Sequence, residues 1–275
     1  MVLASLLGMR SKTFRWLIVL LALTVTAVSL GGLFIDRMYA AETGDWLAQC
    51  LAQDLFDLCI GVPALVVSLI AFEKGSRIAF FALAGLLVFL IYTFIIYTLS
   101  VHFNSFFLLY CLALGLSVYS LIVLLYGVGS GTVKGWFPES RSTTLPIVYL
   151  FFFALLFYAL WLLDIVPSLL SGRSPAILQQ TGLFTNPVHV IDLSVLLPGF
   201  VIAAFLLKKR HSIGYVFAPA IMTFSIAMTL SIATIVFYEY AKGFTPEYSV
   251  GIAMVVSSIL SLIVFLNFTK GIRRI

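Results

Sequence analysis

Eight apolar runs follow one another along this chain, and each is long enough to cross a membrane as a helix. The hydrocarbon core of a bilayer is about 30 Å thick and takes about 20 helical residues to span. With 62% apolar and only 10% charged residues, a chain of 275 residues has too few polar side chains to cover a globule in water. We therefore predict an all-α polytopic integral membrane protein with about eight transmembrane helices. The runs cover residues 14–34, 55–72, 78–99, 105–127, 145–166, 187–207, 213–238 and 248–268.

The first two runs are the least typical of a membrane span. The first, from Trp16 to Phe34, is longer than the 7–15 residues of a signal-peptide core, so we expect it to be retained as a span. In the second, apolar residues begin at Trp46, but Asp54 and Asp57 interrupt them. We expect the portion before residue 55 to lie along the membrane interface.

Lys and Arg are distributed unevenly between the two sides of this topology. All but three of the 16 basic residues share one side, and the three on the other side are Arg37, Arg173 and Lys242. Basic loops are retained in the cytoplasm, so we expect both termini there. The basic residues form no patch with interleaved aromatic side chains, and no nucleic-acid partner is expected. The partner that the composition requires is the lipid bilayer.

The sequence Asp-Leu, followed by four residues and a proline, occurs twice. One copy runs from Asp57 to Pro63 and the other from Asp192 to Pro198, 135 residues later. Each aspartate opens a span that enters the membrane from the outer side, and basic residues follow at the same interval. Four spans per copy would give two halves of equal orientation, as in the parallel class of transporter repeats. We predict a 4+4 parallel internal repeat with halves at 1–130 and 131–275; chance similarity between apolar sequences is the alternative.

The two repeated aspartates should lie just inside the outer membrane interface. A rise of 1.5 Å per helical residue places each about 24 Å from the cytoplasmic end of its span. A carboxylate at that depth should face the bundle or a water-filled vestibule. Pro63 and Pro198 should kink the helices and free the carbonyls of Cys59 and Ser194. Carboxylate and carbonyl could hold a cation, a hydroxyl or a water, or neighbouring side chains could satisfy both.

The longest outer loop lies between the fifth and sixth runs and carries the densest set of hydrogen-bonding side chains. At its end Asn186 is a good N-cap and Pro187 suits the first helical position. His189 and Asp192 then lie three residues apart on one helix face, close enough to pair. Such a pair could relay protons or bind a ligand, or it could secure the loop across the mouth of the bundle. The candidate ligand-binding residues are Asp57, Asp192, His189, Asp164, Asn186, Thr185 and Glu239.

One segment of this region, TNPVHVIDL from Thr185 to Leu193, resembles a segment of prokaryotic multipass membrane proteins whose activity is not characterised. The resemblance covers roughly residues 145–220. It implies a prokaryotic cytoplasmic (plasma) membrane as the location of this chain. It implies no activity, substrate or cofactor.

No motif for a cofactor or a metal accompanies these residues. Cys50, Cys59 and Cys111 form no Cys-x-x-Cys pair, which argues against a redox or metal site. The two histidines other than His189 lie in loops, so the bundle holds no histidine pair for haem. Lys and Arg are absent from the interiors of the spans, which argues against a retinal Schiff base. We therefore expect no cofactor and no metal.

Three functions fit this pattern. The first is a transporter or permease whose extracytoplasmic vestibule recognises a small cation or another small solute, which a duplicated bundle with kinked helices favours. The second is a non-catalytic accessory, sensory or assembly protein whose outer loop contacts a protein partner. The third is a membrane-embedded enzyme that uses His189 and the aspartates as acid and base, although no nucleophile accompanies them. We expect a transporter and not an enzyme.

Overall fold

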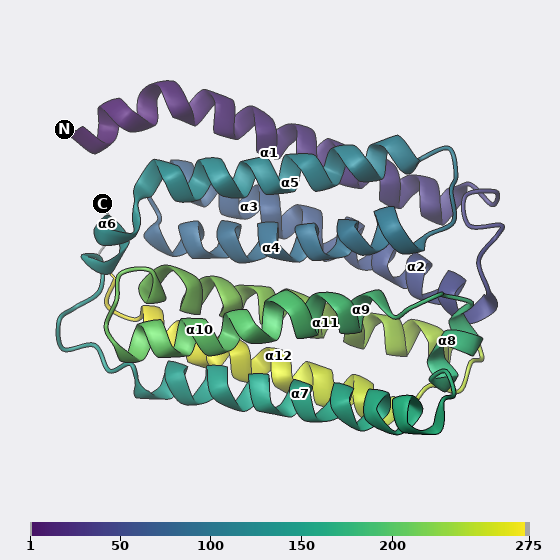
Figure 1. Ribbon diagram of the computed structural model, residues 1–275. Coiled ribbons are helices and arrows are strands. Elements are labelled where there is room, and N and C mark those ends of the chain that lie inside the picture. Colours follow the sequence, from purple (N-terminus) through teal and green to yellow (C-terminus); the bar gives the residue numbers. More distant parts are fainter. Residues whose placement is uncertain (1, 273–275) are drawn as a thin grey trace.

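The computed structural model describes residues 2–272, and the surroundings of side chains from residue 12 onward. Within this range eight helices are long and apolar enough to span a membrane, as predicted (Figure 1). Arg273 and Arg274, two of the basic residues used to predict the orientation, fall outside this range. Arg10 is a third, and the surroundings of its side chain are not described.

The first four spans are formed by α1 (Val2–Phe34), α2 (Gly44–Phe56) with η1 (Asp57–Gly61) and α3 (Val62–Glu73), α4 (Arg77–Ser100) and α5 (Phe107–Val128). The short helix α6 (Ser130–Lys134) follows. The last four spans are formed by α7 (Thr144–Ser171), α9 (Pro187–Ile191) with η2 (Asp192–Leu196) and α10 (Leu197–Lys208), α11 (Gly214–Ala241) and α12 (Tyr248–Thr269). The loop between α7 and α9 contains the short helix α8 (Ala176–Thr181).

The second span begins earlier than predicted. α2 starts at Gly44 and continues through η1 into α3, so the candidate span covers Gly44–Glu73 and not residues 55–72 alone. The side chain of Thr43 caps its first turn by accepting a hydrogen bond from the Trp46 N–H. The reason for the difference is tertiary packing, because α2 is covered by α1 and α11 and its Asp54 is buried among protein groups.

The spans form two groups of four. In the first group α1 packs against α2, α3 and α5, while α4 packs against α3 and α5. In the second group α7 packs against α10 and α12, while α11 packs against α10 and α12. The groups meet where α11 packs against α4 and α2, and α4 and α11 lie against each other near the centre of the molecule (Figure 1). Both of these helices begin at the end that carries the chain termini, so they are parallel.

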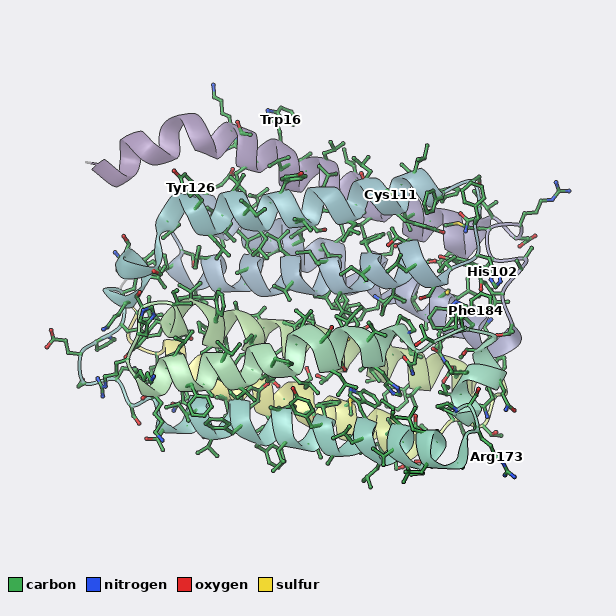
Figure 2. The ribbon with its side chains drawn as sticks, in the orientation of Figure 1. Trp16, His102, Cys111, Tyr126, Arg173 and Phe184 are labelled. Atoms are coloured by element: carbon green, nitrogen blue, oxygen red, sulfur yellow. The ribbon has the colours of Figure 1, made fainter. Side chains whose placement is uncertain are left out.

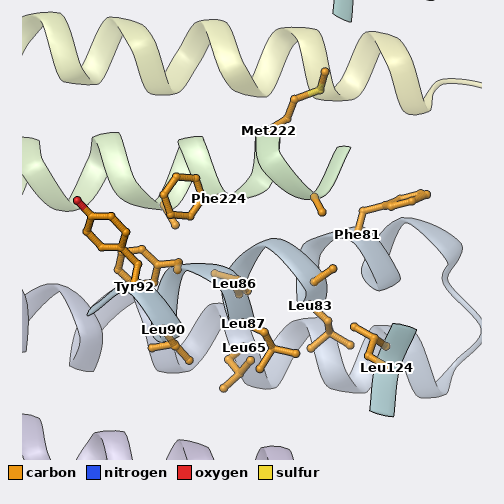
Figure 3. Close-up of a cluster of buried hydrophobic side chains, with 14 of the residues drawn as sticks. Leu65, Phe81, Leu83, Leu86, Leu87, Leu90, Tyr92, Leu124, Met222 and Phe224 are labelled. Carbon is orange, nitrogen blue, oxygen red and sulfur yellow. The ribbon is translucent and has the colours of Figure 1, made fainter. Parts of the chain in front are cut away.

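The contact between α4 and α11 is close because α4 has a glycine at its centre. A Cβ atom on Gly85 would lie 2.5 Å from the carbonyl oxygen of Ala220, so a larger residue would push the two helices apart. Apolar side chains fill the space around this contact (Figure 3). Tyr92 of α4 packs on Phe224 of α11 with 5.9 Å between ring centroids. This contact positions the cavities described below.

The two ends of the bundle are distinct. Both termini and α6 lie at one end, the terminal end, and α8 lies at the opposite or distal end (Figure 1). Exposed aromatic side chains occur at both ends, with Trp16 and Tyr126 toward the terminal end and Phe184 at the distal end (Figure 2). Such aromatic residues are typical of the two membrane interfaces.

Candidate functional site

Both Asp-Leu-x4-Pro segments contain a π-helical turn, and each turn begins at the aspartate. In η1 and in η2 the backbone carbonyl of the aspartate accepts a hydrogen bond from the N–H five residues later. Pro63 and Pro198 follow at the start of the next α-helical segment. The two segments thus share a backbone irregularity of the kind that is frequent at functional sites.

Asp57 is enclosed within the first group of helices. Its side chain is only 1% exposed, and its carboxylate accepts a hydrogen bond of 3.0 Å from Gln53, one turn earlier on the same helix. The amide oxygen of Gln53 accepts a hydrogen bond of 2.6 Å from the hydroxyl of Ser231 on α11. A chain of hydrogen bonds therefore connects η1 with the second group of helices.

A third aspartate, Asp54, is the centre of a polar cluster that the sequence did not indicate. Its carboxylate is completely buried and accepts hydrogen bonds from the hydroxyls of Tyr39 (2.7 Å) and Tyr97 (3.0 Å). Gly32 of α1 leaves room for it, because a Cβ atom there would collide with this carboxylate and with the Tyr39 ring. Burial, with a smaller contribution from Asp54, raises the pKa of Tyr39 well above its ordinary value, which keeps this hydroxyl a donor.

Asp192 is held by a neighbouring helix. Its carboxylate accepts a hydrogen bond of 2.8 Å from the indole N–H of Trp161 on α7. The predicted pair of His189 and Asp192 is wrong, because no hydrogen bond joins them among the described residues. The carboxylate is directed toward α7, and the ring of His189 instead packs on Trp161 with 4.6 Å between centroids. His189 and Asp192 therefore both interact with the Trp161 indole, while no hydrogen bond or ion pair between the two is present among the described residues.

Two small cavities adjoin one another between the two groups of helices. The first, of about 110 Å³, is lined by residues of α2, α4, α9 and α11, including Gln53 and Ser231. The second, of about 80 Å³, is lined by residues of α4, α7, α9, η2, α10 and α11, including Trp161 and Asp192. We call the pair the central chamber, since both parts share the wall residues Tyr92, Val188, Met228 and Ile232. Most of the wall is apolar, as in many small-molecule sites.

A larger cleft, of about 730 Å³, opens at the distal end between α7, α8 and the start of the sixth span. Thr185, Asn186 and His189 line this distal cleft. Asn186 is the predicted N-cap, and its side-chain oxygen accepts hydrogen bonds from the N–H groups of Val188 (3.0 Å) and His189 (3.4 Å). His189 and Trp161 form the partition between the distal cleft and the central chamber.

The sequence predicts one vestibule lined by the candidate residues, but the structure places these residues in several separate locations. The two repeated aspartates lie inside the bundle, and three candidates line the distal cleft. Asp164 is exposed on α7, close enough to His189 for an electrostatic interaction. Glu239 is half-buried near the distal end of α11 and is hydrogen-bonded to Gln49. The packing of the helices separates these carboxylates into different environments.

Sequence reasoning missed the partners of the aspartates. A signal existed for Gln53, because Gln49, Gln53 and Asp57 are spaced by four residues and share one face of a helix. No local signal existed for Trp161, whose partner Asp192 lies 31 residues away.

Within the described part of the chain, no group of three or more His, Cys, Asp and Glu side chains could hold a metal ion. No family model, curated protein or solved structure matches this chain.

Proposed function

We propose that this protein is a membrane transporter that binds a small solute in the central chamber, between two parallel four-helix halves. One observation carries this proposal: the first cavity is lined by pairs of residues, one from each group of helices, with a constant separation in the sequence. Four pairs of its lining residues are separated by 135 positions, which is the spacing of the two Asp-Leu-x4-Pro segments. The pairs are Gln53 and Val188, Thr93 and Met228, Ile96 and Ser231, and Tyr97 and Ile232.

The packing of the halves supports an internal repeat with a two-fold relation. Gly85 and Ala220 are also 135 positions apart, and they lie against each other where α4 meets α11. Contact between equivalent residues is typical of a two-fold axis. Under this two-fold relation α2 would correspond to α9, and α11 would correspond to α4. The packing of α2 on α11 should then be matched by packing of α9 on α4, and both contacts occur. The first cavity would then lie on this axis.

Transporters built from repeats bind their substrates between the repeats, next to interrupted helices. Here the two π-helical turns interrupt the helices that flank the central chamber. Rocking of the halves along α4 and α11 would open the chamber alternately toward each end of the bundle. In this proposal the basic terminal end faces the cytoplasm of a prokaryotic cell, and the distal cleft faces outward.

The lining indicates the class of solute. In three of the four pairs the first half supplies the polar side chain and the second half an apolar one: Gln53 with Val188, Thr93 with Met228, and Tyr97 with Ile232. This lining fits a small neutral solute with one polar edge and one apolar face. A bare divalent cation would need several oxygen ligands, and Asp192 is the one carboxylate among the described lining residues. A cavity of about 150 Å³ can hold a molecule of the size of benzene, so the solute would be about that large.

A solute that binds the folded protein must raise its thermal stability. The test is therefore the melting temperature of the purified protein with a panel of small neutral solutes, followed by uptake of any stabilising solute into proteoliposomes. Ile235→Phe would fill the first cavity and should abolish both responses. Ile259→Phe, on an exposed position of α12, is the matched control and should retain them.

Two outcomes would contradict the proposal. If Ile235→Phe responds as strongly as the wild type, the solute binds elsewhere. If no solute stabilises or crosses, an accessory or sensory role becomes the better account. The enzyme alternative receives no support from a hydrogen bond between His189 and Asp192, because the Asp192 carboxylate accepts its hydrogen bond from Trp161.

A further inference from the structure

The distal cleft has an apolar wall and a polar rim. Leu169 of α7 and Val190 of α9 line it from two sides, and they are 74% and 53% exposed. Leu193 of η2 is half-buried and continues the apolar wall one turn beyond His189, whereas Arg173 and Ser174 follow the end of α7 at the rim. A site with this division fits an amphiphile better than a fully polar solute.

The cleft opens toward the surface that a bilayer would cover. Leu170 and Val195, next to the cleft, are 83% and 62% exposed, and such side chains on a membrane protein face acyl chains. Exposed aromatic residues of the distal loops, Phe103 and Phe184, lie at the same end of the bundle. The rim of the cleft is therefore at the level of lipid headgroups and its wall at the level of acyl chains.

The charge of the cleft favours an anion. Arg173 is the one charged residue among the described residues that line it, and its guanidinium has no hydrogen-bond acceptor among the described residues. The hydroxyls of Ser168 and Ser194 already donate hydrogen bonds to backbone carbonyls one turn earlier in the chain. Asp164 interacts with His189 but does not line the cleft. An arginine in such a position can bind a phosphate through two parallel N–H groups.

We propose that the distal cleft binds an anionic phospholipid, with its phosphate on Arg173 and an acyl chain along Leu169 and Leu193. Figure 2 shows Arg173 at the distal corner of the bundle, where a headgroup would lie. The partition of Trp161 and His189 separates this lipid from the central chamber, so the site is independent of the solute. A bound lipid would connect α7 with the start of the sixth span.

Native mass spectrometry of the full-length protein with phosphatidylglycerol or phosphatidylcholine tests this site. The wild type should retain phosphatidylglycerol about tenfold more tightly than phosphatidylcholine, because only the former is net anionic. Arg173→Gln should lose this preference. Arg37→Gln should keep it, because Arg37 is also exposed at the distal end but lies outside the cleft.

A second pair of variants tests the apolar wall. Leu169→Gln should weaken retention of both lipids by about threefold. Leu170→Gln removes a leucine of similar exposure that does not line the cleft, and it should have no effect. The proposal would be overturned if Arg173→Gln bound phosphatidylglycerol as the wild type does. It would also be overturned if soluble glycerol 3-phosphate bound as tightly as the lipid, which would indicate a site for a free anion.

Discussion

Asp57 in η1 and Asp192 in η2 open equivalent π-helical turns, yet their carboxylates have different surroundings. Asp57 is hydrogen-bonded by Gln53 from its own helix and does not line the central chamber. Asp192 is hydrogen-bonded by Trp161 from a neighbouring helix and lines the second cavity. The same backbone irregularity thus encloses one carboxylate within the protein and presents the other to a cavity.

The difference extends to the residues around each turn. Beside η1, the buried cluster of Asp54, Tyr39 and Tyr97 connects the loop after α1 with α2 and α4. Beside η2, His189 and Trp161 separate two cavities. We therefore expect substitutions around η1 to change mainly the free energy of unfolding, and substitutions around η2 to change mainly the binding of ligands.

The largest expected effect is a loss of stability when Asp54 is substituted. Asp54→Ala removes the acceptor of the Tyr39 hydroxyl and one of the two acceptors of the Tyr97 hydroxyl, which also donates to the Cys50 carbonyl. The loss of these two buried hydrogen bonds should lower the free energy of unfolding by about 3 kcal/mol. Unfolding in a denaturing detergent would measure this loss. Asp36→Ala, at an exposed aspartate, should change it by less than about 0.5 kcal/mol. Equal stability of both variants would show that the η1 region does not stabilise the fold.

The next effect concerns the space that Gly32 leaves for Asp54. Gly32→Ala should destabilise the protein by about 2 kcal/mol, because the new methyl group occupies the position of the Asp54 carboxylate. Gly115→Ala is the matched control, since nothing lies within 4 Å of a Cβ atom there. This control should be neutral or stabilising by up to about 1 kcal/mol. If Gly32→Ala left the free energy of unfolding nearly unchanged, the Asp54 cluster would be able to shift and make room for the methyl group without loss of stability.

A smaller effect on stability is expected at η2. Trp161→Phe removes one hydrogen bond to Asp192 and should cost about 1 kcal/mol, while weakening solute binding by about tenfold. Trp16→Phe, at a 67% exposed tryptophan, should alter neither quantity. Melting curves with and without solute would separate the two effects. If Trp161→Phe lost much of its stability but bound the solute as the wild type does, the region around η2 would stabilise the fold and not bind the ligand, which would contradict the comparison.

The sequence predicted the elements of this fold better than their contacts. Apolar runs of sufficient length, the prolines of the repeated segments and the N-cap at Asn186 act locally, and the spans, the helix irregularities and the cap follow from them. The start of α2 at Gly44 and the partner of Asp192 depend on how helices rotate against one another. Gln53 and Ser231 are 178 residues apart, and no local pattern brings them together.

We propose that the solute binds in the central chamber, whose wall includes Asp192 but not Asp57. The most direct test is the melting temperature of the wild type, Asp57→Asn and Asp192→Asn across one panel of small neutral solutes. We predict that the wild type and Asp57→Asn are stabilised by the same solute and that Asp192→Asn is not. Loss of the response in Asp57→Asn with a normal response in Asp192→Asn, or an equal response in all three proteins, would contradict this account.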